Sequence, residues 1–258
     1  MENKAEIKDY ASESGHWYDA EGNPRYTMIG ANGNERGVTL RDARKDNLFP
    51  SVTTVIRVAA APGLEFWKQQ QVLMAALTLP RKDDEPEADW IARIMRDSKE
   101  TGKKAAERGT RIHGAIEKFF THGGVDILDM PYAVAARDKV IEFANHNVIW
   151  ESEKSFCRNG YGCKIDLCSK DGFVVDFKTK EFGPDNLPKA FDEQIMQLAA
   201  NRLAAGMPNA RCANIFISVD NPGLAHLVEH SDEALERGME MFFNLLSFWM
   251  LKNNYRTI

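Results

Sequence analysis

The chain has 258 residues, of which 43% are hydrophobic, 28% charged and 10% aromatic, and this composition excludes a disordered, collagen-like or low-complexity protein. Its 33 Lys and Arg residues against 38 Asp and Glu residues give a formal net charge of −5, so the protein is mildly acidic. Every apolar run is shorter than the roughly 18 residues of a membrane span, so we expect a protein that does not act in a membrane.

The N-terminus carries neither an apolar signal-peptide core nor an Arg-rich amphipathic pattern, so we expect neither a secretory signal nor a transit peptide. A reducing, cytoplasmic environment follows from this. The cysteines form no C-x-x-C pair and match no zinc or iron–sulfur spacing, so we interpret them as small, partly buried hydrophobic residues. They are Cys157, Cys163, Cys168 and Cys212.

The first fifty residues predict a small β-meander. Their aromatic and β-branched clusters (HWYD, RYTMI and GVTL) are separated by Gly- and Asn-rich segments that are typical of turns. We therefore divide the chain into a β-rich extension over residues 1–50 and a larger domain over residues 51–258.

A helix is expected directly after Pro50. Ser51, Thr53 or Thr54 can cap its N-terminus, and the pattern predicts that it continues through Phe66 and Trp67.

Two further helices are predicted in the middle of the chain, over residues 90–120 and 132–146, with His122-Gly123-Gly124 closing the first. The acidic run at 83–89 before them is interpreted as a solvated surface loop.

From Val148 onward the hydrophobic pattern alternates, which indicates β-strands. In the first strand of a predicted hairpin one face carries Cys163, Ile165 and Leu167, and the other carries Lys164, Asp166 and Cys168. In the second strand one face carries Phe173, Val175 and Phe177, and the other carries Val174, Asp176 and Lys178. The hairpin thus places two carboxylates and an amine on one face.

The turn supports a register that pairs Asp166 with Asp176. That pairing leaves the three-residue loop 170–172, with Gly172 at the position that requires a positive φ. Opposed carboxylates repel each other, and a divalent cation bound between them removes this repulsion. An oxygen-rich site of this kind suits Mg²⁺ or Mn²⁺. The alternative is an exposed hairpin whose Asp–Lys pairs are merely solvated.

The rest of the chain predicts an α/β fold. A helix from about Leu187 to Ala205 and an apolar strand at 213–219 complete a strand–helix–strand crossover. A C-terminal helix is expected over residues 231–252, with Ser231 as its cap.

The helix that contains ERGTRIHGAIEKFF presents Gly109, His113 and Glu117 on one face, at intervals of four residues. A neutral imidazole at His113 can supply a nitrogen ligand to the same cation, with Glu117 as its support or as a further acidic group. The alternative is a histidine at the edge of the core. The core-facing stripe of this helix consists of Ile112, Ile116, Phe119 and Phe120.

Arg108 and Arg111 make this segment basic, because residues 101–118 carry five Lys or Arg residues against two Glu residues. A basic helix on an acidic protein favours contact with a phosphate backbone.

These motifs, taken in order, resemble the PD-(D/E)xK nuclease superfamily, and in particular its RecB-type branch, which includes phage exonucleases and the mitochondrial genome maintenance exonuclease. The resemblance covers roughly residues 105–205 and the PSVTTVI segment near Pro50. Its motifs are GTRIH at 109–113, Glu153, GCKID at 162–166, DFK at 176–178 and QIMQL at 194–198.

The resemblance implies a restriction-endonuclease-like core, with a central mixed sheet flanked by helices, and metal-dependent hydrolysis of DNA. It implies that the metal ligands are His113, Asp166, Asp176 and the backbone carbonyl of Phe177. It also implies that Lys178 assists the attacking water.

The remaining motifs of the resemblance concern four polar residues. Glu153 matches an acidic position of the family, with Glu151 as a competitor, and Ser51 and Thr53 lie in the segment expected to contact substrate. Gln194 matches the glutamine of a Q-x-x-x-Y motif.

Helix 187–205 departs from the family at one position. Leu198 stands where that motif has its tyrosine, and Gln197 comes one residue too early.

We therefore expect a metal-dependent deoxyribonuclease, an exonuclease acting on DNA ends in recombination, replication or genome processing in a bacterium or phage-infected cell. The alternative is a nuclease-like module that binds nucleic acid or a protein without cutting, which the leucine at 198 and the negative net charge favour. A third hypothesis is an α/β protein whose acidic hairpin has no function. This hypothesis requires the order of the motifs to be a coincidence. Trp17, Tyr18 and Tyr26 can stack on bases or pack in the core.

Overall fold

The structure is a computed structural model and describes residues 15–255. The first fourteen residues of the predicted extension, and the last three of the predicted domain, lie outside this described part.

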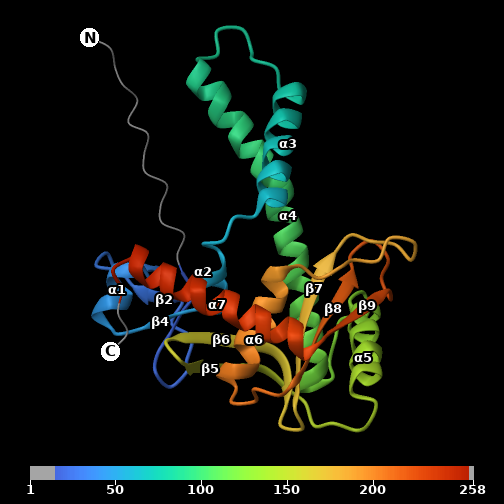
Figure 1. Ribbon diagram of the computed structural model, residues 1–258. Coiled ribbons are helices and arrows are strands. Elements are labelled where there is room, and N and C mark those ends of the chain that lie inside the picture. Colours follow the sequence, from blue (N-terminus) through green and yellow to red (C-terminus); the bar gives the residue numbers. More distant parts are fainter. Residues whose placement is uncertain (1–14, 256–258) are drawn as a thin grey trace.

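A five-stranded mixed sheet forms the centre of the molecule, in the order β5-β6-β7-β8-β9 (Figure 1). Its strands are β5 (Glu151–Arg158), β6 (Tyr161–Ser169), β7 (Phe173–Lys180), β8 (Arg211–Ser218) and β9 (Ala225–His230). Neighbouring strands are antiparallel except β7 and β8, which are parallel because a helix connects them. This confirms the predicted α/β fold with a mixed sheet flanked by helices.

Helices cover both faces of the sheet (Figure 1). The crossover helix α6 (Asp192–Ala204) and the C-terminal helix α7 (Asp232–Lys252) pack with α2 (Val52–Ile56) over one face, around Tyr161 and Leu198. The other face is covered by α5 (Met130–Ala144) and the C-terminal half of α4 (Glu87–His122). Two apolar cores therefore hold the sheet in place.

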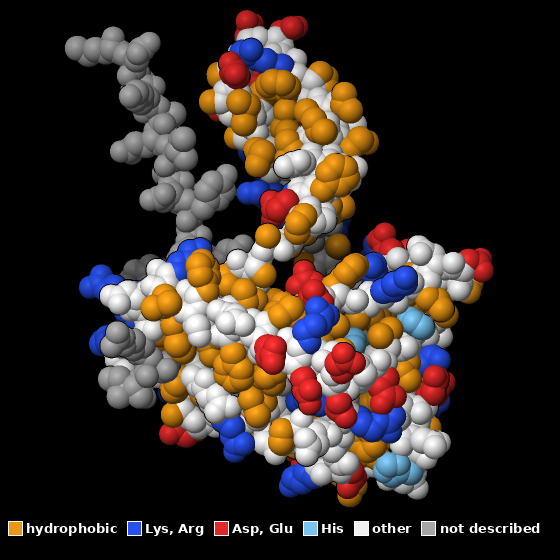
Figure 2. All heavy atoms as spheres, in the orientation of Figure 1, with side chains coloured by type: hydrophobic (Ala, Val, Ile, Leu, Met, Phe, Trp, Pro, Cys, Tyr) orange, Lys and Arg blue, Asp and Glu red, His pale blue; other side chains and the backbone are white. Residues whose placement is uncertain are grey.

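Helix α4 is long and projects from the body. Its first half pairs with α3 (Pro62–Thr78) to form a helical hairpin that stands away from the sheet (Figure 1). Hydrophobic side chains are exposed over this hairpin (Figure 2), among them Phe66, Leu73 and Leu77. As predicted, α4 ends at Gly123, whose φ of +70° closes the helix in the left-handed conformation.

The predicted N-terminal β region is present as two small antiparallel sheets. One pairs β1 (Trp17–Tyr18) with β4 (Phe49–Pro50), and the other pairs β2 (Thr27–Ile29) with β3 (Glu35–Gly37). The GVTL cluster does not form a strand throughout, because Thr39 caps the short helix α1 (Leu40–Lys45) in a capping box with Asp42.

The helix predicted to run from Ser51 through Trp67 is wrong as a single element. Ser51 does cap α2, since its hydroxyl accepts the Thr54 N–H at 3.0 Å, but that helix ends at Ile56. A separate helix, α3, begins at Pro62, because proline suits the first turn of a helix and disrupts its interior.

The predicted faces of β6 hold only up to Ile165. Cys163 and Ile165 pack in one core, whereas Leu167 packs in the other and Cys168 returns to the first. The alternation changes next to Asp166, where Glu153 of β5 has a φ of +57° and forms no pair in the strand register. A local break in the ladder therefore redirects the side chains at this point.

The other boundaries shift by a few residues. Helix α6 begins at Asp192 rather than near Leu187, and α7 begins after its Ser231 cap as predicted. The edge strand β9 was not predicted. No helix among residues 15–255 is both long and apolar enough to cross a bilayer.

Candidate active site

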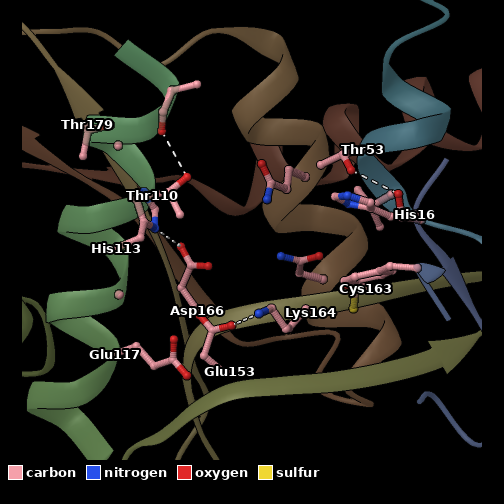
Figure 3. A pocket seen from close by; sticks show the side chains of 18 of the residues that line it. His16, Thr53, Thr110, His113, Glu117, Glu153, Cys163, Lys164, Asp166 and Thr179 are labelled. Atoms are coloured by element: carbon pink, nitrogen blue, oxygen red, sulfur yellow. Dashed lines mark hydrogen bonds and ion pairs between the residues drawn. The ribbon is translucent and has the colours of Figure 1, made fainter. Parts of the chain in front are cut away.

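A cavity of about 710 Å³ opens beside the sheet, between α4 and the N-terminal region (Figure 3). Helix α4 forms one wall with Gly109, His113 and Glu117, and Ser51 and Thr53 belong to the opposite wall. Strands β5 and β6 contribute Glu153, Lys164 and Asp166, and α6 contributes Gln197 and Asn201. The cavity thus collects many of the predicted site residues from distant parts of the sequence.

The β6–β7 hairpin has the predicted register. Leu167 pairs with Val175 and Ser169 with Phe173, and Gly172 in the turn has a φ of +90°. The β6–β7 pairing stops one step before Asp166 and Asp176, and the Asp166 carboxylate instead accepts the Phe177 N–H at 2.8 Å. Backbone pairing between the two strands therefore ends at the carboxylates, where the Asp166 side chain takes the place of the next backbone bond.

Lys178 is held in place by two partners. Its Nζ donates to Asp176 Oδ1 at 2.8 Å and to Gln197 Oε1 at 3.0 Å. Burial opposes the positive charge on this side chain, but the carboxylates of Asp176 and Asp166 outweigh it and raise the pKa of Lys178 above its ordinary value. The ammonium is therefore charged and fixed between β7 and α6. Unlike Asp166 and Gln197, neither Lys178 nor Asp176 is part of the cavity wall.

His113 faces the carboxylates from α4, with Nδ1 3.8 Å from Asp166 Oδ2 (Figure 3). Burial lowers the pKa of His113, although Asp176 partly opposes this effect. The imidazole is therefore neutral near pH 7 and has a nitrogen lone pair available for a ligand. Helix α4 comes close here because a Cβ at Gly109 would lie only 2.9 Å from Thr179 Oγ1.

Asp166 carries the most perturbed carboxyl group of the cavity. Burial, followed by the charge of Asp176, raises its pKa to about 7, even though Lys178 and the Phe177 N–H favour the ionised form. Two carboxylates in this space thus compete for the available positive charge.

Glu153 and Glu117 add further acidic groups on the cavity side (Figure 3). Glu153 pairs with Lys164, and its left-handed backbone is unusual for a glutamate. Its competitor Glu151 pairs with Lys154 and Lys170 and is not part of the cavity wall.

Helix α6 turns a different face to the cavity than the motif predicted. Gln194 caps the helix, where its Oε1 accepts the Phe191 N–H at 2.6 Å, and Leu198 is fully buried in the core. Gln197 and Asn201, one helical turn apart, line the cavity instead. The glutamine in contact with Lys178 is therefore Gln197.

The two predicted phosphate-binding arginines lie outside the cavity wall. Arg108 is 3.7 Å from Asp220 and Arg111 is 3.6 Å from Asp129, and both side chains are largely exposed. The Arg108–Asp220 pair is exposed on both sides and therefore weak, so Arg108 can exchange its partner for a phosphate, whereas the Asp129 partner of Arg111 is largely buried.

The three aromatic candidates differ in how exposed they are. Trp17 and Tyr18 are each 2% exposed and belong to the interior, as the packing alternative predicts. Tyr26 lines the cavity, stacks on His16 with ring centroids 4.4 Å apart and shares a 2.6 Å hydrogen bond with Tyr18. Tyr18 also lines the cavity, but Tyr26 is the more exposed of the two rings and is therefore better placed to meet a base.

Two polar residues near the carboxylates were not predicted. Asn214 of β8 donates to Asp176 Oδ2 at 2.8 Å, and His230 of β9 lies 2.8 Å from Asn214 Oδ1. An asparagine inside the apolar strand RCANIFIS was the only signal in the sequence that could have indicated them.

The predicted metal ligands are near one another but are not assembled. Within residues 15–255, no three His, Cys, Asp or Glu side chains lie close enough together to hold a metal ion as they stand. His113 and Asp166 face each other, whereas the Asp176 carboxylate is bonded to Lys178 and Asn214.

Two buried asparagines predict opposite effects on stability. Both amide atoms of Asn201 are buried without a hydrogen-bond partner, whereas both amide atoms of Asn214 have one. Asn201→Leu is expected to raise the free energy of unfolding by about 1–3 kcal/mol, and Asn214→Leu to lower it by a similar amount. Urea unfolding of the two matched variants tests this; equal changes of the same sign would contradict it.

Comparison with known proteins gives a limited picture. No protein-family model matches the chain, and no curated protein matches it in sequence. A protein from Eubacterium rectale described as a candidate exonuclease is similar in structure, with a TM-score of 0.38 and 11% identity over 58% of this chain and 69% of its own. An alkaline exonuclease from Laribacter hongkongensis has a TM-score of 0.33 and 15% identity over 46% of this chain and 65% of its own, less than two thirds of its length.

Proposed function

We propose that this protein is a metal-dependent deoxyribonuclease that hydrolyses phosphodiester bonds, and that it acts as an exonuclease on DNA ends. The observation that carries the proposal is the end of the β6–β7 pairing at Asp166 and Asp176, where His113 faces Asp166 and Lys178 is bonded to Asp176. Two carboxylates, an ammonium and a neutral imidazole are the groups that phosphodiester hydrolysis with a divalent cation requires.

The donor set fits Mg²⁺ or Mn²⁺. The oxygens of Asp166 and Asp176 are hard ligands, and the neutral His113 adds a nitrogen that Mn²⁺ accepts. The raised pKa of Asp166 supports this, because a cation offsets the repulsion between the two carboxylates. When bound, the cation supplies Lewis acidity at the phosphate and acidifies water.

The protein's own residues then have separate tasks. Asp166, Asp176 and the backbone carbonyl of Phe177 would hold the cation, with His113 as the nitrogen ligand. Lys178, anchored by Gln197, presents its ammonium to the attacking water or to the charge that develops on the phosphate. Glu153 is a further group that can hold or move a proton, and Glu117 lies beside His113 on α4.

The cavity is the proposed path of the DNA strand. Helix α4 forms one wall and the N-terminal region the other, and the preference for ends comes from the resemblance of the motifs to exonucleases. Ser51, Thr53 and Tyr26 line the far wall, where they can contact sugar, phosphate or base. Arg108 and Arg111 are exposed on α4, where they can contact the approaching backbone.

A cleavage assay tests the proposal. End-labelled linear DNA and closed circular DNA, each single- and double-stranded, are incubated with wild-type protein in Mg²⁺, Mn²⁺ or EDTA. We expect loss of linear DNA only, and only with a metal. Cleavage of circles would indicate an endonuclease, and cleavage in EDTA would contradict the metal requirement.

The same assay distinguishes the proposed nuclease from a module that only binds DNA. A module that binds without cutting leaves every substrate intact, yet it retains DNA with an affinity that falls steeply as salt rises. That outcome would replace the proposal.

A further inference from the structure

Asp176 is hydrogen-bonded to a row of polar side chains, Asn214 and His230, that runs across the sheet. Asn214 Nδ2 lies 2.8 Å from Asp176 Oδ2, and His230 Nε2 lies 2.8 Å from Asn214 Oδ1. Asp176 is 2% exposed and Asn214 is 0% exposed, so the bond between them is shielded from water, and His230 at the outer end is half-buried.

The strand register produces this row. In the parallel pair β7–β8, Asn214 stands opposite Asp176, so their side chains share a face of the sheet. In the antiparallel pair β8–β9, Asn214 stands opposite Val228, and His230 follows two residues later on the same face. The three residues therefore form a diagonal row that ends at the edge strand.

Hydrogen-bond chemistry gives the row a direction. An ionised carboxylate only accepts hydrogen bonds, so the amide of Asn214 must donate with its nitrogen and turn its oxygen toward His230. That oxygen needs a donor, so Nε2 of His230 carries a proton. Each orientation thus follows from the one before it.

We propose that Asn214 and His230 are positioning residues that fix the orientation of the Asp176 carboxylate, and through it the affinity of the site for its divalent cation. This inference rests on the proposed function. Lys178 contacts both oxygens of Asp176 at 2.8 Å, so by itself it does not select a rotation of the carboxylate. The bond from Asn214 engages one oxygen and does select it.

Packing alone does not account for these residues. Asn214 lies between Ala213 and Ile215 in a strand whose neighbours are apolar and fully buried, where an aliphatic side chain is the ordinary choice. Outer partners of metal ligands of this kind change metal affinity by about 10–100-fold when they are removed.

The test measures Mn²⁺ binding in the absence of DNA, by calorimetry and by the electron paramagnetic resonance signal of free Mn²⁺. The variants are His230→Phe, which keeps a ring but loses the donor, and His230→Gln, which retains an N–H near the position of Nε2. Asn214→Leu removes the middle of the row. His226→Phe is the matched control, because His226 lies on the same strand and faces Phe216 rather than Asn214 in the register.

We expect Mn²⁺ affinity to fall about 10–100-fold in His230→Phe and Asn214→Leu. His230→Gln and His226→Phe should stay close to wild type. If Asn214→Leu does not fold, His230→Phe decides the matter, because His230 lies at the sheet edge and its variant can be checked for folding by thermal unfolding.

Two failures can be told apart. Wild-type Mn²⁺ affinity in folded His230→Phe overturns the positioning role and leaves the proposed function intact. Equal losses in His230→Phe and His230→Gln also overturn it, because the donor is then not what matters. If wild-type protein itself does not bind Mn²⁺, the proposed function fails and this inference fails with it.

Discussion

Purified Lys178→Met protein is expected to cleave DNA about 10²–10⁴-fold more slowly than wild type while remaining folded. Methionine keeps much of the unbranched stem of lysine but removes the ammonium that contacts Asp176 and Gln197. The loss arises because, among residues 15–255, no other cation is bonded to both of these partners. Single-turnover rates at saturating Mg²⁺ measure it.

Two variants control for this result. Lys180→Met makes the same change two residues later on β7, where the lysine is exposed and lies over the Phe191 ring, and it should cleave normally. Lys178→Arg keeps the charge with a different shape and should retain part of the activity if charge is the main contribution. Wild-type cleavage by Lys178→Met would exclude Lys178 from the reaction.

Asp166→Asn is expected to abolish cleavage and yet to stabilise the metal-free protein at pH 8. Folding raises the pKa of Asp166 from its ordinary 3.8 to about 7, so the folded protein holds a proton there that the unfolded chain has released. A raised pKa contributes stability below pH 4, and that contribution is lost as the pH rises to 7. At about 1.4 kcal/mol for each pKa unit, the wild type loses on the order of 4 kcal/mol across this window.

The asparagine variant has no proton to lose, so the two proteins should differ most at pH 8 and least near pH 4. Urea unfolding in EDTA at several pH values measures this difference. Mn²⁺ should then reverse the order, stabilising the wild type but not the variant. Asp171→Asn, the same chemical change in the exposed β6–β7 turn, controls for net charge. Parallel pH profiles for wild type and Asp166→Asn would contradict the prediction.

The hairpin could be predicted from the sequence because its geometry is local. The position of Gly172 selects the loop length, and the loop length sets which residues stand opposite each other. The face of α4 that carries His113 followed in the same way from helical spacing.

The face of α6 could not be predicted, because it depends on how the helix is rotated against the sheet. Residues three apart on a helix differ by about 60° in direction, so the motif could not distinguish Gln194 from Gln197. Burial of Leu198 in the core sets the rotation, and it brings Gln197 and Asn201 to the cavity. That choice is made by tertiary packing.

The supporting histidine was missed for a similar reason. His230 lies 54 residues after Asp176 on an edge strand with weak alternation, and only the order of strands in the sheet brings the two near each other. The end of one helix and the start of another near Pro62, in contrast, could have been predicted from the sequence, because proline is rare in the interior of a helix.

Helix α4 runs without a break from the tip of the projecting hairpin past His113. At 1.5 Å per residue, Glu87 at the tip and His113 are roughly 39 Å apart along one rod. Beside the cavity the same helix is anchored, because Ile112 and Ile116 on either side of His113 are buried in the core. A single continuous helix therefore joins the exposed hairpin to the cavity wall, with one half fixed by packing and the other half standing free of the sheet.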